Sequence, residues 1–130
     1  MSDNSFTYRF GTHLTNWTGI WSADKASPLS WTLIGKIVTL MLQSTLASAS
    51  NMTGTITNVT ALPTYLRPTT AIYLLTKSEQ SGTPSLTGGS VLIGTNGIIT
   101  IYATTALATF TSSASNTGTV ICTAWTYTVD

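Results

Sequence analysis

The residues that could do acid–base or nucleophilic chemistry are few and widely spaced in this sequence. The chain has one histidine, His13, and no Gly-x-Ser-x-Gly motif that would pair it with an activated serine. A general acid and base pair requires two groups that approach each other, and every acidic residue falls in a predicted loop or at a terminus. The acidic residues are Asp3, Asp24, Glu79 and Asp130. We therefore expect no enzyme activity.

The sequence also offers no set of ligands for a metal ion or a nucleotide. One histidine and one cysteine fall short of the three or four protein ligands of a zinc site, and the carboxylates are too scattered for calcium. The glycine-containing segments 82–89 and 94–97 precede no predicted helix, so neither forms a phosphate cradle at a helix N-terminus. We expect no cofactor. Cys122 lies in the apolar run 120–125 and is predicted to be a buried small hydrophobe.

Aromatic side chains are the remaining candidates for binding. Four tryptophans and five tyrosines are many for a chain in which 7% of the residues are charged. Aromatic faces stack on sugars and form hot spots in protein interfaces. Trp31 and Trp125 fall in strand patterns and are predicted to be core or subunit-interface residues. Trp17, Trp21 and Tyr65 fall in predicted loops and are candidates to face a ligand.

Three charged residues complete the candidate receptor-binding set. Arg67 lies close to Tyr65 in the sequence, and Lys77 and Glu79 lie in a predicted loop over 77–89. Nine charged side chains spread along the chain form no cluster that could steer a partner. Binding is therefore predicted to depend on aromatic and hydroxyl groups and to change little with salt.

Composition also excludes several classes of partner and location. A formal net charge of +1 gives no basic patch for nucleic acid. The most apolar stretch, 37–46, is shorter than the ~20 residues of a membrane span, so no membrane insertion is expected. No secretory signal is visible, which predicts synthesis in a cytoplasm and little use of the sequons at Asn16, Asn51 and Asn58. Residues 1–5 are predicted to be flexible.

The pattern of apolar residues predicts one all-β domain over 1–130. Roughly a third of the chain is serine or threonine, which suits pleated strands and turns. Strands are predicted at 6–10, 31–34, 37–42, 54–59, 71–76, 90–95, 98–103 and 119–129, with a strand or bridge near 107–111. The segment 11–30 is predicted to be mainly a loop with one short strand near 19–22. About eight short strands without helical periodicity indicate an antiparallel β-sandwich of jelly-roll type.

Two turns carry the clearest local signals. Gly35-Lys36 separates two apolar runs and predicts a β-hairpin. Asn96-Gly97 separates two further runs and predicts a two-residue type I′ hairpin turn. The segment 54–59 is predicted to be an edge strand. Pro63 and Pro68 exclude a regular helix and a central strand between them, so that segment is predicted to be an ordered connection.

The order of these motifs resembles the head domains of viral fibres, especially the C-terminal modules of bacteriophage fibres. The resemblance covers most of the chain from Trp17 onward. It rests on a tryptophan-rich loop, the stretch Trp31–Leu40, the Leu-Pro-x-x-x-Arg-Pro connection Leu62–Pro68, the hairpin Val91–Tyr102 and the final aromatic strand Trp125–Val129. Adenovirus-type fibre knobs and other trimeric jelly rolls are broader relatives in architecture.

This resemblance implies a homotrimeric head on a virion that attaches to a host-cell surface receptor or glycan. Unlike a usual fibre head, the chain has no long shaft of repeats before the first tryptophan. A structural capsid-decoration or assembly protein that contacts only other virion proteins is therefore the main alternative, and a non-viral lectin-like module is a further one. Apolar residues expected to be exposed on an uncharged surface, such as Met41, Leu46 and Met52, also favour a closed cyclic assembly, which would cover them.

Overall fold

The computed structural model describes residues 8–19, 24–49, 54–80, 83–84, 88–110, 117–120 and 123–129. Within these ranges the chain forms strands and one short 3-10 helix, η2 (Thr64–Leu66). The strands are β1 (Tyr8–His13), β2 (Asn16–Thr18), β3 (Lys25–Ala26), β4 (Leu29–Ile34), β5 (Ile37–Leu42), β6 (Leu46–Ala49), β7 (Ile56–Asn58), β8 (Ile72–Thr76), β9 (Ser78–Gln80), β10 (Thr83–Pro84), β11 (Gly89–Ile93), β12 (Ile99–Tyr102), β13 (Thr117–Val120) and β14 (Ala124–Thr128). The predicted antiparallel β-sandwich is confirmed.

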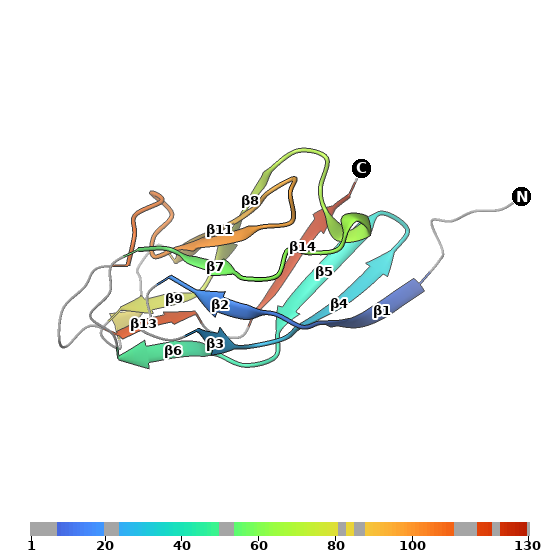
Figure 1. The fold of residues 1–130 in the computed structure, drawn as a ribbon. Helices are drawn as coiled ribbons and strands as arrows, with labels where there is room; N and C mark the ends of the chain where they lie inside the picture. Colours follow the sequence, from blue (N-terminus) through green and yellow to red (C-terminus); the bar gives the residue numbers. More distant parts are fainter. Residues whose placement is uncertain are drawn as a thin grey trace, which may run out of the picture.

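The strands form three antiparallel sheets, in the orders β1-β4-β5-β14, β10-β9-β13-β6 and β3-β2-β7-β12-β11-β8. Several extended segments pass from one sheet to another, as β5 continues into β6 and β13 into β14 (Figure 1). Taken as continuous segments, the described strands number about eight, as predicted. The segment β1–β2 pairs with β3–β4 on one side and β7 on the other, and β13–β14 pairs with β5–β6 and β9. These pairings make two successive Greek keys, the number that a jelly roll contains.

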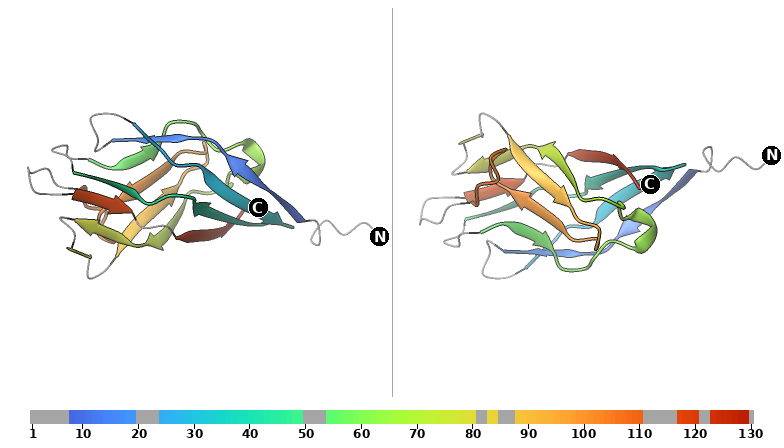
Figure 2. Two further views of the ribbon diagram at one scale, coloured as in Figure 1. Left: turned by 90° about the horizontal axis from the view of Figure 1, so that it is seen from below. Right: turned by 90° about the horizontal axis from the view of Figure 1, so that it is seen from above.

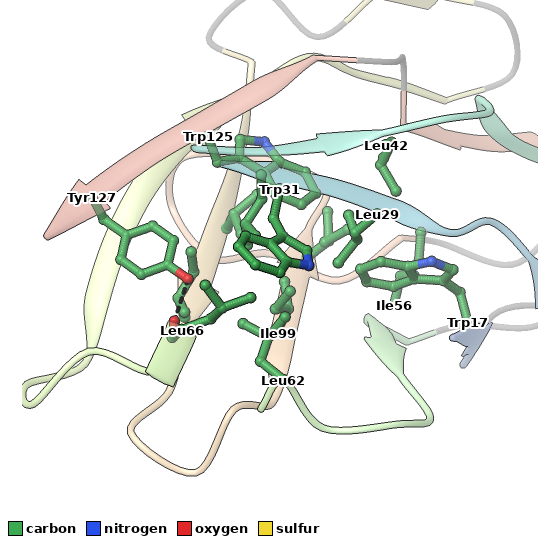
Figure 3. Packing of buried hydrophobic residues seen from close by; sticks show 14 of the residues in the cluster. Trp17, Leu29, Trp31, Leu42, Ile56, Leu62, Leu66, Ile99, Trp125 and Tyr127 are labelled. Atoms are coloured by element: carbon green, nitrogen blue, oxygen red, sulfur yellow. Dashed lines mark hydrogen bonds between the residues drawn. The ribbon is translucent and has the colours of Figure 1, made fainter. Parts of the chain in front are cut away.

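Alternating side chains on facing strands build one core between the layers. In β4 and β5, every second residue is buried, because successive side chains of a strand point to opposite faces. Trp31 lies at the middle of this core, with Trp17 toward one end and Tyr127 toward the other (Figure 3). Ile99 of β12 and Leu62 of the connection after β7 lie across from Trp31 (Figure 3), so aromatic residues occupy the middle and both ends of the cluster drawn there.

The hairpin between β4 and β5 has the two-residue turn that the sequence predicts. Ile34 pairs with Ile37, and Gly35 has φ of 61°. A positive φ at the first central position is typical of a type II′ turn, which glycine adopts without steric cost. The interpretation of Gly35-Lys36 as a hairpin turn is therefore confirmed.

The hairpin between β11 and β12 exists, but its predicted type I′ turn is wrong. The Gly97 N–H donates to the Gly94 carbonyl over 3.0 Å, and the Gly94 N–H donates to the Ile98 carbonyl over 2.9 Å. Gly97 has φ of 82°, whereas a type I′ turn would also require a positive φ at Asn96, which is not observed. The loop therefore has three residues, and the Asn96 side chain accepts from the Ile98 N–H over 3.1 Å. A three-residue loop with glycine in the left-handed region is the next most common hairpin connection.

Strand β1 exposes its aromatic residues, although their alternation with polar residues in the sequence is typical of a half-buried strand. Tyr8 and Phe10 are 56% and 71% exposed. The register places Gly11 opposite Trp31, and a Cβ on Gly11 would lie 2.8 Å from the indole ring. The missing side chain lets Trp31 pack directly against the β1 backbone, which turns Tyr8 and Phe10 to the outer face.

Three further boundaries differ from the prediction. The segment 11–30 contains β2 and β3 as well as the ends of longer strands, and 77–89 contains β9 and β10. Strand β7 is not an edge strand, because it pairs with both β2 and β12. The sequence of each of these segments is mainly polar, which gives only a weak local preference for a loop or an edge strand. Pairing with distant strands overrides that preference. The Phe110 bridge to Gly54 confirms the bridge predicted near 107–111.

The connection between β7 and β8 is irregular, as the two prolines predict, and is fixed by buried hydrogen bonds. The Tyr127 hydroxyl donates to the Leu66 carbonyl over 2.5 Å (Figure 3). The Arg67 Nε donates to the Leu62 carbonyl over 2.7 Å. The Asn58 side chain, 3% exposed, accepts from the Ile99 N–H and donates to the Gly97 carbonyl. A glycan on Asn58 would break these bonds, so this sequon is closed in the folded chain.

We predict that Tyr127→Phe lowers the free energy of unfolding by about 1–3 kcal/mol, because the Leu66 carbonyl loses a buried donor. Burial also raises the pKa of Tyr127 above its ordinary value near 10. The stabilisation from this hydroxyl is therefore complete below pH ~10 and decreases as the pH rises further. Urea denaturation of both proteins from pH 7 to 11 tests this expectation. A stability difference that does not shrink above pH ~10 would contradict it.

Candidate interaction surfaces

Trp17 is buried, so its predicted role as a loop residue that faces a ligand is wrong. It lies in β2, its side chain is 0% exposed, and its Nε1–H donates to the Ser27 carbonyl over 2.8 Å. Trp17 packs with Ile56 at one end of the core (Figure 3). The sequence signal was ambiguous because the neighbouring polar residues and glycine are typical of a loop.

The core assignment of Trp31 and Trp125 is confirmed. They are 8% and 1% exposed. The Trp125 Nε1–H is buried without a hydrogen-bond partner, as is the Thr76 hydroxyl. Neither indole is therefore available to a ligand at the surface of this chain.

Tyr65 is exposed, but its ring is partly used within the molecule. It lies on η2, is 42% exposed, and meets the Trp31 ring edge-on at a centroid distance of 5.6 Å. The Arg9 guanidinium carbon lies 4.6 Å from the Tyr65 centroid, within cation–π range. The cluster of Arg9, Trp31 and Tyr65 joins the edge strand β1 to the connection between β7 and β8.

The other candidates do not join Tyr65 in one site. Arg67 is half-buried and holds the Leu62 carbonyl. Lys77 is exposed at the end of β8, and Glu79 lies in β9, paired with Thr119 of β13. Ile72 at the start of β8 pairs with Ile93 beside the 94–97 turn, so Lys77 lies about 17 Å along the strand from the Arg67 end. Trp21 lies outside the described residues, as do residues 1–5, Asn51 and Cys122.

Met41 is exposed as the sequence predicts, whereas Leu46 is buried at 1% exposed and Met52 lies outside the described residues. The surface to which Met41 belongs was not predicted, because the register of four strands assembles it. We name it the β1–β14 face and define it by the outward side chains of β1, β4, β5 and β14. Its apolar members, each 45–71% exposed, are Tyr8, Phe10, Ile34, Ile37 and Met41. Its small and hydroxyl members are Thr12, Ser30, Thr32, Thr39, Ala124, Thr126 and Thr128. The Thr39 and Thr126 hydroxyls lie 3.1 Å apart, which links adjacent strands across the middle of this face.

A second surface of similar chemistry covers the opposite layer. We name it the β7–β8 face and define it by outward side chains of β7, β12, β11 and β8. These are Thr57, Tyr73, Leu75, Leu92, Thr100 and Tyr102, whereas Ser90, which pairs with Leu75 and Tyr102, is only 6% exposed. Leu75 is 74% exposed and Tyr73 is 56% exposed. The period-two pattern could have indicated both faces, but only the strand pairings show which residues are neighbours.

The charged side chains that the structure describes lie outside both faces. Arg9 stacks on Tyr65 from the inner side of β1, Lys36 is in a turn, and Lys77 follows β8. Asp24 and Lys25 lie near β3, and Arg67 is in the β7–β8 connection. Over the described ranges there is no group of three or more His, Cys, Asp or Glu that could hold a metal ion. No helix in those ranges is long and apolar enough to cross a membrane.

Comparison with known proteins adds no family to this description. No protein-family model matches the sequence, and no curated protein matches it at a significant level. The fold, the two uncharged faces and the Arg9–Trp31–Tyr65 cluster are therefore the basis for a functional proposal.

Proposed function

We propose that this chain is the homotrimeric head of a viral fibre or spike, which attaches a virion to a host-cell receptor or glycan. The supporting observation is the separation of the two ends of the sandwich. The described chain begins at Tyr8, beside Ile34 and the 35–36 turn. The opposite end of the sandwich holds the strand termini that lead into four connections, and these belong to β2, β6, β9 and β13 (Figure 2). A head carried on an N-terminal shaft would present these connections outward.

The candidate receptor-binding residues fall into two groups, one near each end of the sandwich. Tyr65 and Arg67 lie near the end at which β1 begins, since Tyr65 contacts Arg9. Lys77 and Glu79 lie toward the other end, and Trp21 falls in the connection from β2 to β3. We propose that the receptor is contacted by the connections of the second group. Loops on a rigid β scaffold are the usual place for binding residues.

A structural capsid-decoration or assembly protein is the second candidate. It is favoured by the burial of Trp17 and by the packing of Tyr65 on Trp31, which leave fewer aromatic side chains free for a ligand. The two uncharged faces would equally suit contacts with other virion proteins. A non-viral lectin-like module would share the β-sandwich, but it would need a group of exposed side chains to which a glycan could bind.

Binding of the purified chain to a glycan array and to candidate host cells tests the proposal. We expect Trp21→Ala to weaken adsorption at least about tenfold, because an aromatic hot spot contributes about 2 kcal/mol or more. Tyr65→Ala serves as the matched control at the opposite end and should adsorb as the parent does. Adsorption should also be nearly the same at low and high salt.

The possible outcomes separate the candidates. Loss of adsorption with Tyr65→Ala but not with Trp21→Ala would move the site to the β1 end and contradict the proposal. If the parent protein binds no cell or glycan tested, while it binds purified virions, the structural role replaces the attachment role.

A further inference from the structure

The dipeptide Asn96-Gly97 is the described part of the chain that is most open to a spontaneous covalent change. Asparagine is a thermolabile residue, because its amide reacts with the backbone nitrogen of the next residue, and a following glycine has no side chain to hinder the attack. Asn96 is exposed in the loop between β11 and β12. The other described asparagines, Asn16 and Asn58, precede bulky tryptophan and valine residues. The structure of this loop therefore decides whether the dipeptide reacts.

Deamidation at Asn96-Gly97 requires only base and water. Base removes the proton of the Gly97 amide nitrogen, which then attacks the side-chain carbon Cγ of Asn96. A bond forms between these two atoms and the bond from Cγ to the side-chain nitrogen breaks. The side-chain nitrogen takes a proton from water and leaves as ammonia, and a cyclic imide remains. Water opens the imide at either carbonyl group, which gives aspartate or, when the main chain then runs through Cγ, isoaspartate.

The loop activates the side-chain carbonyl group that would be attacked. The Ile98 N–H donates to Asn96 Oδ1 over 3.1 Å. A donor placed at this oxygen stabilises the negative charge that develops on it during the attack. A Cβ at Gly94 would lie 2.8 Å from Asn96 Oδ1, so the close approach of this side chain to the loop backbone depends on glycine there. The electrophile is therefore held in place and polarised.

The loop restrains the nucleophile instead. The Gly97 N–H donates to the Gly94 carbonyl over 3.0 Å, and this bond must break before base can remove the proton. The Gly97 carbonyl accepts from the Leu62 N–H over 3.0 Å and from Asn58 Nδ2 over 3.1 Å. These bonds fix the buried Gly97 on both sides of its Cα, so its nitrogen is not free to turn toward the Asn96 side chain.

We infer that Asn96-Gly97 is a deamidation site that the folded loop keeps closed and that opens when the bonds to Asn58 and Leu62 break. Opening of one loop disrupts fewer contacts than unfolding of the whole domain, so local opening is the route of lower free energy. Isoaspartate lengthens the main chain within the loop, so the modified loop no longer fits the bonds that held Gly97. Each opening that leads to reaction is thus recorded as a permanent negative charge. This inference does not depend on the proposed attachment role.

Peptide mapping of the chain after incubation at mildly alkaline pH tests the inference. Chymotrypsin would release residues 93–102 as a peptide in which Asn96 is the one amide side chain. Mass spectrometry then measures its conversion to aspartate and isoaspartate. Asn58→Ala removes one of the bonds that hold the Gly97 carbonyl. Leu46→Ala truncates a buried residue of β6, in a different sheet from β11 and β12, and is the matched control for a loss of global stability.

We expect Asn96 in the folded parent to react at least ~10-fold more slowly than in the urea-unfolded chain, because a bonded amide reacts only through openings. Asn58→Ala should raise the rate in the folded protein by ~5-fold or more, the effect of one lost hydrogen bond, whereas Leu46→Ala should react as the parent does. Circular dichroism shows whether each variant is folded. Arg67→Met, which removes the milder bond to the Leu62 carbonyl, replaces Asn58→Ala if that variant does not fold and should also accelerate the reaction.

Two results would overturn the inference. A folded parent that reacts as fast as the unfolded chain would show that the loop gives no protection. Equal acceleration by Asn58→Ala and Leu46→Ala would show that the reaction proceeds through global unfolding and not through opening of the loop.

Discussion

Trp17→Ala is expected to lower the free energy of unfolding by about 4 kcal/mol or more. Truncation of a fully buried tryptophan costs about 3–5 kcal/mol through lost contacts and the cavity that remains. The side chain is 0% exposed and packs in the core with Ile56. The variant also loses the Nε1–H bond to the buried Ser27 carbonyl, which leaves that acceptor without its donor. Since the free energy of unfolding of natural domains is about 5–15 kcal/mol, this loss is a large part of the total stability.

Urea denaturation followed by circular dichroism measures this effect. Leu14→Ala, which truncates an apolar residue that is 72% exposed and belongs to neither face, is the control and should change stability by less than about 1 kcal/mol. Equal small effects of the two substitutions would show that Trp17 is not a core residue. Its role as a ligand-facing residue would then have to be reconsidered.

Gly97→Val is expected to destabilise the fold by about 2–5 kcal/mol. Gly97 has φ of 82°, a region that a β-branched residue strongly disfavours. A Cβ at this position would lie 2.7 Å from the Arg67 Nε and 2.8 Å from the Leu62 carbonyl oxygen. These two atoms are hydrogen-bonded to each other, so valine would strain both the turn and the connection that it supports.

Thr95→Val is a control in the same loop, because Thr95 is exposed and valine has nearly the same shape. We expect its denaturation midpoint to match that of the parent within about 0.5 kcal/mol. A Gly97→Val midpoint equal to that of Thr95→Val would mean that the loop does not have the described conformation.

The sequence was most informative where strands alternate strictly. Trp31 in β4 and Trp125 in β14 were expected to be core or subunit-interface residues, and both are buried in the core. Gly35-Lys36 was also recognised, because a two-residue turn leaves little choice of conformation. These features depend on local periodicity, which one sequence displays directly.

Features that depend on distant partners could not be predicted in this way. The outward position of Phe10 follows from the packing of Trp31 over Gly11, which lies on a different strand. The burial of Trp17 depends on pairing between β2 and β7. Lys77 and Arg67 lie near opposite ends of β8, so they do not share one site. Their separation follows from the register of β8 and β11, which the sequence alone does not show.

A homotrimeric head has three times the mass of one chain, so the mass of the parent protein in solution shows whether the proposal holds. Light scattering coupled to gel filtration, at micromolar concentration of the parent protein, is the decisive measurement. We expect a single species of three times the mass of one chain. A species with the mass of one chain would contradict it, because both uncharged faces would then remain exposed to water.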